Sequence, residues 1–205
     1  MFQVSVSPDM GMYNLLRSQG YDMAYALAEF IDNAIQAFQI HCPKRYKFGP
    51  PLEVKIKFYS AEYSEPSLRN SIVIQDNGSG IDRPRLQDAF KPAKPVPVKG
   101  LSEFGIGMKA AAVWFTDTWS VTTRPIGDSK EYEFNFDLPK LINQGRDVVD
   151  VQENAGKGKT AGTEITLSNV RRPLNKVRFE QIRIDLQELY QKFTGGAVSH
   201  CRFRN

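Results

Sequence analysis

Strand-like segments joined by short turns place the tightest constraint on the fold of this chain. Alternating apolar residues mark 53–59, and a continuous apolar run marks 70–76. Further strand patterns cover 119–125 and 131–138, which flank the turn Ile-Gly-Asp-Ser-Lys, and then 146–152 and 162–170. Turns outnumber helical crossovers between these segments. We therefore expect an α+β fold, a two-layer sandwich in which a mostly antiparallel mixed sheet carries helices on one face.

Helical patterns fill the gaps between these segments. The first firm element is 27–38, where apolar residues recur at three- and four-residue steps. Prolines and a glycine interrupt the pattern over 41–51. We also expect a short helix over 83–90, a helix that follows a glycine turn within 105–115, and a closing helix that ends at two glycines, its apolar positions being Phe179, Ile182, Leu186, Leu189 and Phe193.

The chain has 41% hydrophobic and 24% charged residues, as expected for a globular protein. Its length and composition predict one domain over 1–205. The net charge of +4 is spread along the chain, so charge alone does not indicate nucleic-acid binding. No apolar stretch approaches the roughly 20 residues that span a bilayer. Two cysteines are too few for a disulfide framework, and each follows a histidine without the close spacing of a zinc site. We expect an intracellular protein with no membrane partner, cytoplasmic, or nuclear if its source is a eukaryote.

The segment Ile-Gln-Asp-Asn-Gly-Ser-Gly-Ile-Asp, 74–82, ends a strand in a glycine cluster. Asn-Gly between apolar runs is typical of a hairpin, but the following residues favour a helix, and two glycines suit close approach of the backbone to a ligand. Asp76 then lies at a strand end. A partly buried carboxylate needs donors, which the amino group of adenine supplies and guanine does not. The pattern predicts recognition of adenine.

A second glycine cluster, 100–111, stands where a helix begins. Taken alone it could be a flexible loop, but Gly105 and Gly107 leave backbone amides free at a helix N-terminus, where phosphates bind. Lys109 in the first turn is unfavourable there unless an anion offsets it. A dinucleotide-binding fingerprint would require a preceding strand of a βαβ unit, and the P-loop pattern is absent from the sequence.

Glu29 and Asn33 are four residues apart, so they project from one face of the 27–38 helix. An isolated pair of this kind is usually a solvated polar face. The pair also places a carboxylate and an amide one turn apart on a single helix.

The ordered segments Glu-Phe-Ile-Asp-Asn-Ala, Asp-Asn-Gly-Ser-Gly-Ile, Phe-Gly-Ile-Gly-Met-Lys and Ala-Gly-Thr-Glu-Ile-Thr-Leu resemble the four motifs of the GHKL superfamily, which includes DNA gyrase, a heat-shock chaperone, histidine kinases and MutL. The Glu-x-x-Asp-Asn-Ala form looks closest to the gyrase, MutL and MORC-like branch. The resemblance covers nearly the whole chain and implies the Bergerat-type ATP-binding fold, with ATP and Mg²⁺ as ligands.

The resemblance also assigns roles by motif position. Glu29 would be the general base, Asn33 the magnesium ligand, Asp76 the reader of adenine, and Thr163 a support for Asp76. Asp32 is left outside the catalytic set, because in relatives that position often makes a structural ion pair. The remaining positions implied to contact nucleotide are Gly78, Gly80, Ile81, Lys99, Gly100, Phe104, Gly105, Ile106, Gly107, Met108 and Lys109.

Two further implications concern movement and assembly. The proline- and lysine-rich segment 91–104 suits a lid that closes over the phosphates, and relatives couple closure to dimerisation through the N-terminal segment. We expect ATP hydrolysis to drive this cycle. A nucleotide-sensing module without turnover stays open, whereas a histidine kinase would need an upstream phospho-accepting histidine. The chain ends in what looks like the start of another strand, so we expect further domains that could bring DNA or a protein client.

Overall fold

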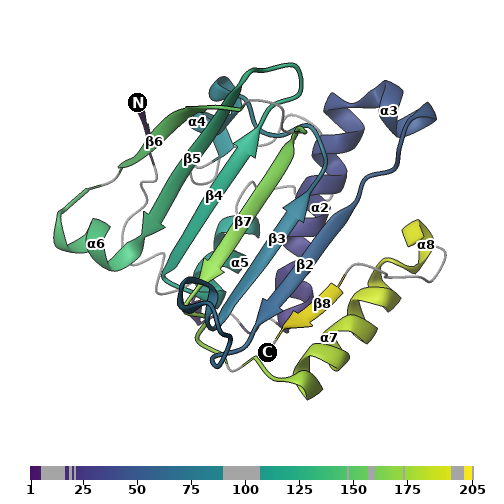
Figure 1. The fold of residues 1–205 in the computed structure, drawn as a ribbon, viewed down its shortest axis with the longest axis vertical. Coiled ribbons are helices and arrows are strands. Elements are labelled where there is room, and N and C mark those ends of the chain that lie inside the picture. Colours follow the sequence, from purple (N-terminus) through teal and green to yellow (C-terminus); the bar gives the residue numbers. More distant parts are fainter. Residues whose placement is uncertain are drawn as a thin grey trace.

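A computed structural model describes residues 1–5, 17–18, 20, 22–89, 107–146, 148–156, 160–172, 174–194 and 201–204. Its centre is one sheet with the strand order β1-β6-β5-β4-β7-β3-β2-β8 (Figure 1). The strands are β1 Phe2–Ser5, β2 Val54–Tyr59, β3 Ser71–Asp76, β4 Thr118–Arg124, β5 Lys130–Asp137, β6 Val148–Ala155, β7 Gly162–Ser168 and β8 Cys201–Arg204.

Neighbouring strands of this sheet pair antiparallel except β8, which is parallel to β2. β3 is buried along its first four residues and lies between β7 and β2, as its continuous apolar run predicts. β4 alternates buried and half-buried positions, with Trp119, Val121 and Thr123 inward. The α+β class with a mostly antiparallel sheet is confirmed.

The helices are α2 Met23–His41, α3 Pro43–Phe48, α4 Arg83–Ala89, α5 Gly107–Phe115, α6 Leu138–Asn143, α7 Lys176–Leu189 and α8 Gln191–Thr194, with a 3₁₀ turn at Pro66–Leu68. α2 packs against both α5 and α7, and these three form the helical layer on the sheet (Figure 1). One core joins the two layers, and its fully buried members include Leu27, Phe58, Ile72, Phe115, Phe134, Leu167 and Leu186.

Several expected boundaries were wrong. A strand, β1, precedes α2 in the chain and pairs with β6, and the four residues of β1 alone do not indicate this distant partner. α2 begins at Met23, because Asp22 caps it by accepting from the N–H of Ala24 at 2.8 Å. The segment 41–51, expected to be irregular, contains α3, in which Pro43 takes the first helical position.

Two expected ends also differ. β6 runs to Ala155, into a stretch expected to be a polar loop, because its polar residues pair across to β5, where Lys130 forms a 2.8 Å ion pair with Glu153. The closing helix divides after Leu189, which is 39% exposed and so does not belong to the core stripe. The predictions that Phe193 is apolar core and that two glycines end this helix fall on side chains and residues outside the described part of the structure.

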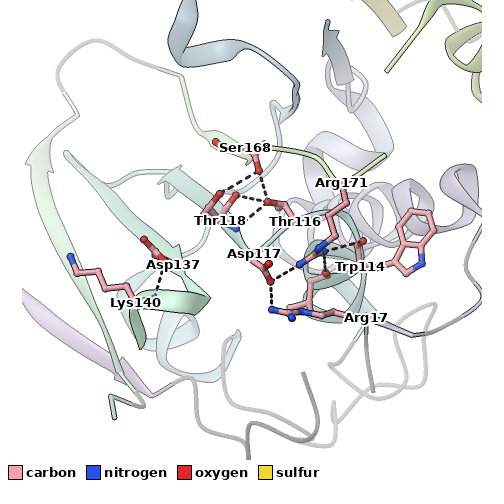
Figure 2. Close-up of polar contacts among 10 residues, drawn as sticks. Arg17, Trp114, Thr116, Asp117, Thr118, Asp137, Lys140, Ser168 and Arg171 are labelled. Atoms are coloured by element: carbon pink, nitrogen blue, oxygen red, sulfur yellow. Dashed lines mark hydrogen bonds and ion pairs between the residues drawn. The ribbon is translucent and has the colours of Figure 1, made fainter. Parts of the chain in front are cut away.

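The C-terminal end of α5 is fixed by arginines (Figure 2). Arg171 donates to the carbonyl oxygens of Val113 and Trp114, and the Arg172 guanidinium lies 3.6 Å from the centre of the Trp114 ring. Asp117 pairs with both Arg171 and Arg17, which ties Arg17 to the same place. Cations suit the negative end of a helix, so these contacts stabilise the C-terminal end of α5.

Candidate functional site

Glu29, Asp32 and Asn33 lie within one turn of α2, and all three are partly buried. The helical spacing places Glu29 and Asn33 on one face, as predicted. α2 owes this arrangement to its other side, where Ala24 and Leu27 are fully buried in the core. Because that apolar stripe fixes the rotation of the helix, the polar face is held in one direction.

The Glu29 carboxylate rests against the first residue of α5. A Cβ atom built on Gly107 would lie 1.9 Å from Oε2 of Glu29 and 2.7 Å from its Cδ. A side chain at position 107 would displace the carboxylate, so glycine allows Glu29 to lie against the start of α5. Burial, and then the negative charge of Asp32, raise the pKa of Glu29 above its usual value. A raised pKa is what a general base near neutral pH needs.

Asp76 is the last residue of β3 and is paired in register with Thr163 of β7. Its Oδ1 accepts a 2.7 Å hydrogen bond from the N–H of Gly78. Burial raises the pKa of Asp76 to about 6, and hydrogen bonds from the backbones of Gly78 and Thr163 oppose that rise. The following loop runs to α4 rather than into a returning strand, so the hairpin interpretation of 74–82 is excluded.

The fold itself explains why glycine occupies positions 78 and 80 after Asp76. A Cβ on Gly78 would lie 2.9 Å from Oδ1 of Asp76. Gly80 has a positive φ of 64°, and a Cβ there would lie 1.9 Å from the backbone oxygen of Arg124. Gly80 therefore permits packing of the loop on β4. The next residue, Ile81, is partly buried against the core.

Thr123 and Gly162 belong to this site although the sequence did not point to them. Thr123 is buried, and its hydroxyl accepts from the N–H of Ile81 at 2.8 Å and lies 3.0 Å from the hydroxyl of Thr163. Gly162 approaches Asp76 so closely that a Cβ would lie 2.1 Å from the Asp76 backbone oxygen. Thr163 thus supports Asp76 through the backbone, while its hydroxyl contacts Thr123. The Ala-Gly-Thr order was the available signal for Gly162.

Lys109 is partly enclosed by apolar side chains. It lies in the first turn of α5 but lines a small cavity with Phe30, Met108, Trp119 and other apolar residues. Burial lowers the pKa of Lys109 to about 8. The Lys109 side chain thus lies partly between α5 and the strands that carry Trp119 and Ile165. Five predicted contact residues, Lys99, Gly100, Phe104, Gly105 and Ile106, lie outside the described residues.

The family comparison agrees with this geometry. Residues 21–163 match the model of the histidine kinase-, DNA gyrase B- and HSP90-like ATPases, which is well over half of the 205-residue chain. The chain belongs to this family. It is an ATP-binding domain of the ATPase type, and its sheet with packed helices is the GHKL fold. The match includes α2, β3, α5 and the start of β7.

Two other comparisons are brief. A search among curated proteins finds no match to the chain. Within the described part of the chain, every helix is too short or too polar to cross a bilayer.

Proposed function

We propose that this domain binds ATP with Mg²⁺ and hydrolyses it, and that hydrolysis drives closure of a lid and dimerisation. The observation that carries the proposal is the contact between the Glu29 carboxylate and Gly107 at the start of α5. It brings a candidate base to a helix N-terminus, where phosphate binds through free N–H groups and the helix dipole. The Glu-Phe-Ile-Asp-Asn-Ala motif supports placement in the gyrase, MutL and MORC-like branch.

The residues present fit both ligands. Asn33 lies on the face of α2 that carries Glu29 and could offer its amide oxygen to magnesium, which takes one or two protein oxygens beside phosphates and water. The magnesium ion would neutralise charge on the phosphates. Asp76 offers a carboxylate at the end of β3 for the amino group of adenine. The amides around 104–108 would hold the phosphates.

Hydrolysis then depends on positioning and charge. The Glu29 carboxylate would orient a water molecule and accept a proton from it as the water oxygen attacks the γ-phosphorus. The bond from that phosphorus to the β-phosphate oxygen breaks, which gives ADP and phosphate. Asn33, one turn away, would bind the magnesium ion and so help to hold the triphosphate at a fixed distance from the water.

Calorimetry of the chain with Mg²⁺ and ATP, ADP or GTP tests nucleotide choice. We expect both adenine nucleotides to bind and GTP to bind more weakly, since guanine presents an acceptor to Asp76. Asp76→Asn should weaken ATP binding by on the order of 1–3 kcal/mol, because a charged acceptor is replaced by an amide that can present a donor. Equal affinities for ATP and GTP, or no binding, would contradict the proposal.

The pH dependence of the same titration follows from Asp76. Since its pKa is raised to about 6, the carboxylate of the free protein is lost as the pH falls through 6, and adenine loses its charged acceptor. We expect ATP affinity to fall more steeply below pH 6 in the wild type than in Asp76→Asn. The variant is the control, because the phosphates titrate identically in both proteins. Parallel curves would exclude the carboxylate from binding.

The lid prediction concerns 91–104. Lys91, Lys94 and Lys99 supply positive charge to the triphosphate, and the prolines restrict the open ensemble, which reduces the entropic cost of ordering. We expect a non-hydrolysable ATP analogue to slow amide hydrogen exchange in 91–104, while ADP leaves the segment exchanging faster. Sedimentation of the full-length protein should show a dimer with the analogue and a monomer with ADP. Unchanged exchange would exclude a lid, and an unchanged mass would exclude the nucleotide-driven dimer.

A further inference from the structure

Tyr190 joins the end of α7 to the helix that carries the candidate catalytic residues. Its hydroxyl donates to Oδ1 of Asp32 at 2.6 Å and also lies 3.2 Å from the backbone oxygen of Ala28. These groups are 158 and 162 residues away in the sequence. Tyr190 is 8% exposed, so its contacts are made in the interior between α7 and α2.

The two acceptors lie on either side of Glu29 along α2. Ala28 immediately precedes Glu29, while Asp32 follows it by three residues and immediately precedes Asn33. A single hydroxyl therefore holds the turn of α2 that carries both the candidate base and the candidate magnesium ligand. Translation or rotation of that turn would change both distances at once.

Tyr190 is itself fixed by α7. Its backbone N–H donates to the carbonyl of Leu186 at 3.0 Å, and Ile182 and Leu186 of the same helix are buried in the core. α7 ends just before it, and Leu189 is turned outward while the Tyr190 ring is buried. The hydroxyl thus lies at the tip of a rigid aromatic ring that extends from an anchored helix end.

The contact does more than fill space. Asp32 is partly buried, and a carboxylate in that setting needs a donor. Tyr190 supplies one from another helix. Without the hydroxyl, Asp32 would have to reach solvent or α2 would have to shift, and either change would disturb the turn between Ala28 and Asn33.

We propose that Tyr190 is a positioning residue that acts through Asp32 and Ala28 to hold Glu29 in place, and that it couples the nucleotide site to α7. This inference rests on the proposed ATP hydrolysis. α7 leads into α8 and β8, so the contact gives the C-terminal part of the domain a direct connection to the catalytic turn. The direction of coupling is reciprocal, since a ligand that orders the turn also orders α7.

Tyr190→Phe removes the hydroxyl and keeps the ring. We expect it to lower the single-turnover rate of ATP hydrolysis about tenfold while ATP affinity stays within twofold, because a small displacement of a catalytic group costs rate rather than binding. Tyr25→Phe is the matched control, since Tyr25 lies on α2 but is 60% exposed, and it should match the wild type. Asp32→Asn, which keeps an acceptor oxygen, should recover part of the rate lost in Asp32→Ala.

Amide hydrogen exchange gives a readout that does not depend on turnover. A non-hydrolysable ATP analogue should slow exchange in 183–190 of the wild type but not of Tyr190→Phe. A normal single-turnover rate in Tyr190→Phe would overturn the positioning role, as would a loss of ATP affinity equal to the loss of rate. Equal exchange in the two proteins would overturn the coupling. If the wild type binds ATP without hydrolysing it, the proposed hydrolysis fails and the exchange comparison still decides the coupling.

Discussion

Glu29→Ala is expected to abolish ATP hydrolysis while leaving nucleotide affinity within about threefold. A general base contributes on the order of 10²–10⁴ to rate, and the carboxylate is the candidate base that lies against the start of α5. Glu29→Gln should be equally inactive, because the amide keeps the shape but takes up no proton. Single-turnover hydrolysis and calorimetry on the same preparations measure the two quantities.

The stability of the Glu29 variants separates a catalytic role from a structural one. Burial raises the pKa of Glu29, so the folded chain favours the protonated form. That contribution to stability is complete at acid pH, below the usual pKa, and is lost as the pH rises through the raised pKa. At neutral pH neither Glu29→Ala nor Glu29→Gln should therefore lower the free energy of unfolding. A clear loss of stability together with loss of nucleotide binding would mean that Glu29 is structural.

Gly107→Ala is expected to lower the rate of hydrolysis about 100-fold without unfolding the domain. The added Cβ would lie 1.9 Å from Oε2 of Glu29, so the carboxylate must move, and a displacement of about 1 Å is enough for a loss of this size. The backbone needs no change, because the atom in conflict is the end of a flexible side chain. Alanine in place of glycine near a helix start should keep or slightly raise the melting temperature.

Measurement of both quantities makes the Gly107 prediction specific. A stable variant with a low rate supports the contact between Glu29 and α5. A stable variant with wild-type hydrolysis would show that the carboxylate is not held against Gly107 during turnover. A large fall in the melting temperature would show that the added methyl group displaces backbone rather than the Glu29 side chain.

Local patterns predicted the parts of the site that local chemistry determines. The three- and four-residue periodicity of α2 placed Glu29 and Asn33 on one face, and the apolar run of β3 placed Asp76 at a strand end. The helix after Gly80 was also confirmed, with Asp82 capping α4 by accepting from the N–H of Arg85 at 3.0 Å.

Long-range contacts account for what the sequence did not reveal. β1 is a strand because β6 pairs with it, and nothing within its four residues requires that. Gly80 is glycine because it packs on the backbone at Arg124, a partner that is distant in the sequence. Tyr190 looked like one more residue of a closing helix, and only the fold brings its hydroxyl to Asp32. Such contacts depend on the assembled layers rather than on periodicity.

A crystal structure of the domain with Mg²⁺ and a non-hydrolysable ATP analogue tests the central claim most directly. The account predicts the adenine amino group within hydrogen-bonding distance of the Asp76 carboxylate and magnesium bound by the Asn33 amide oxygen. The terminal phosphate should lie near the N-terminus of α5, with a water molecule held by Glu29 in line with the γ-phosphorus. A nucleotide bound elsewhere, or one whose base avoids Asp76 while Glu29 faces away from the phosphates, would contradict the account.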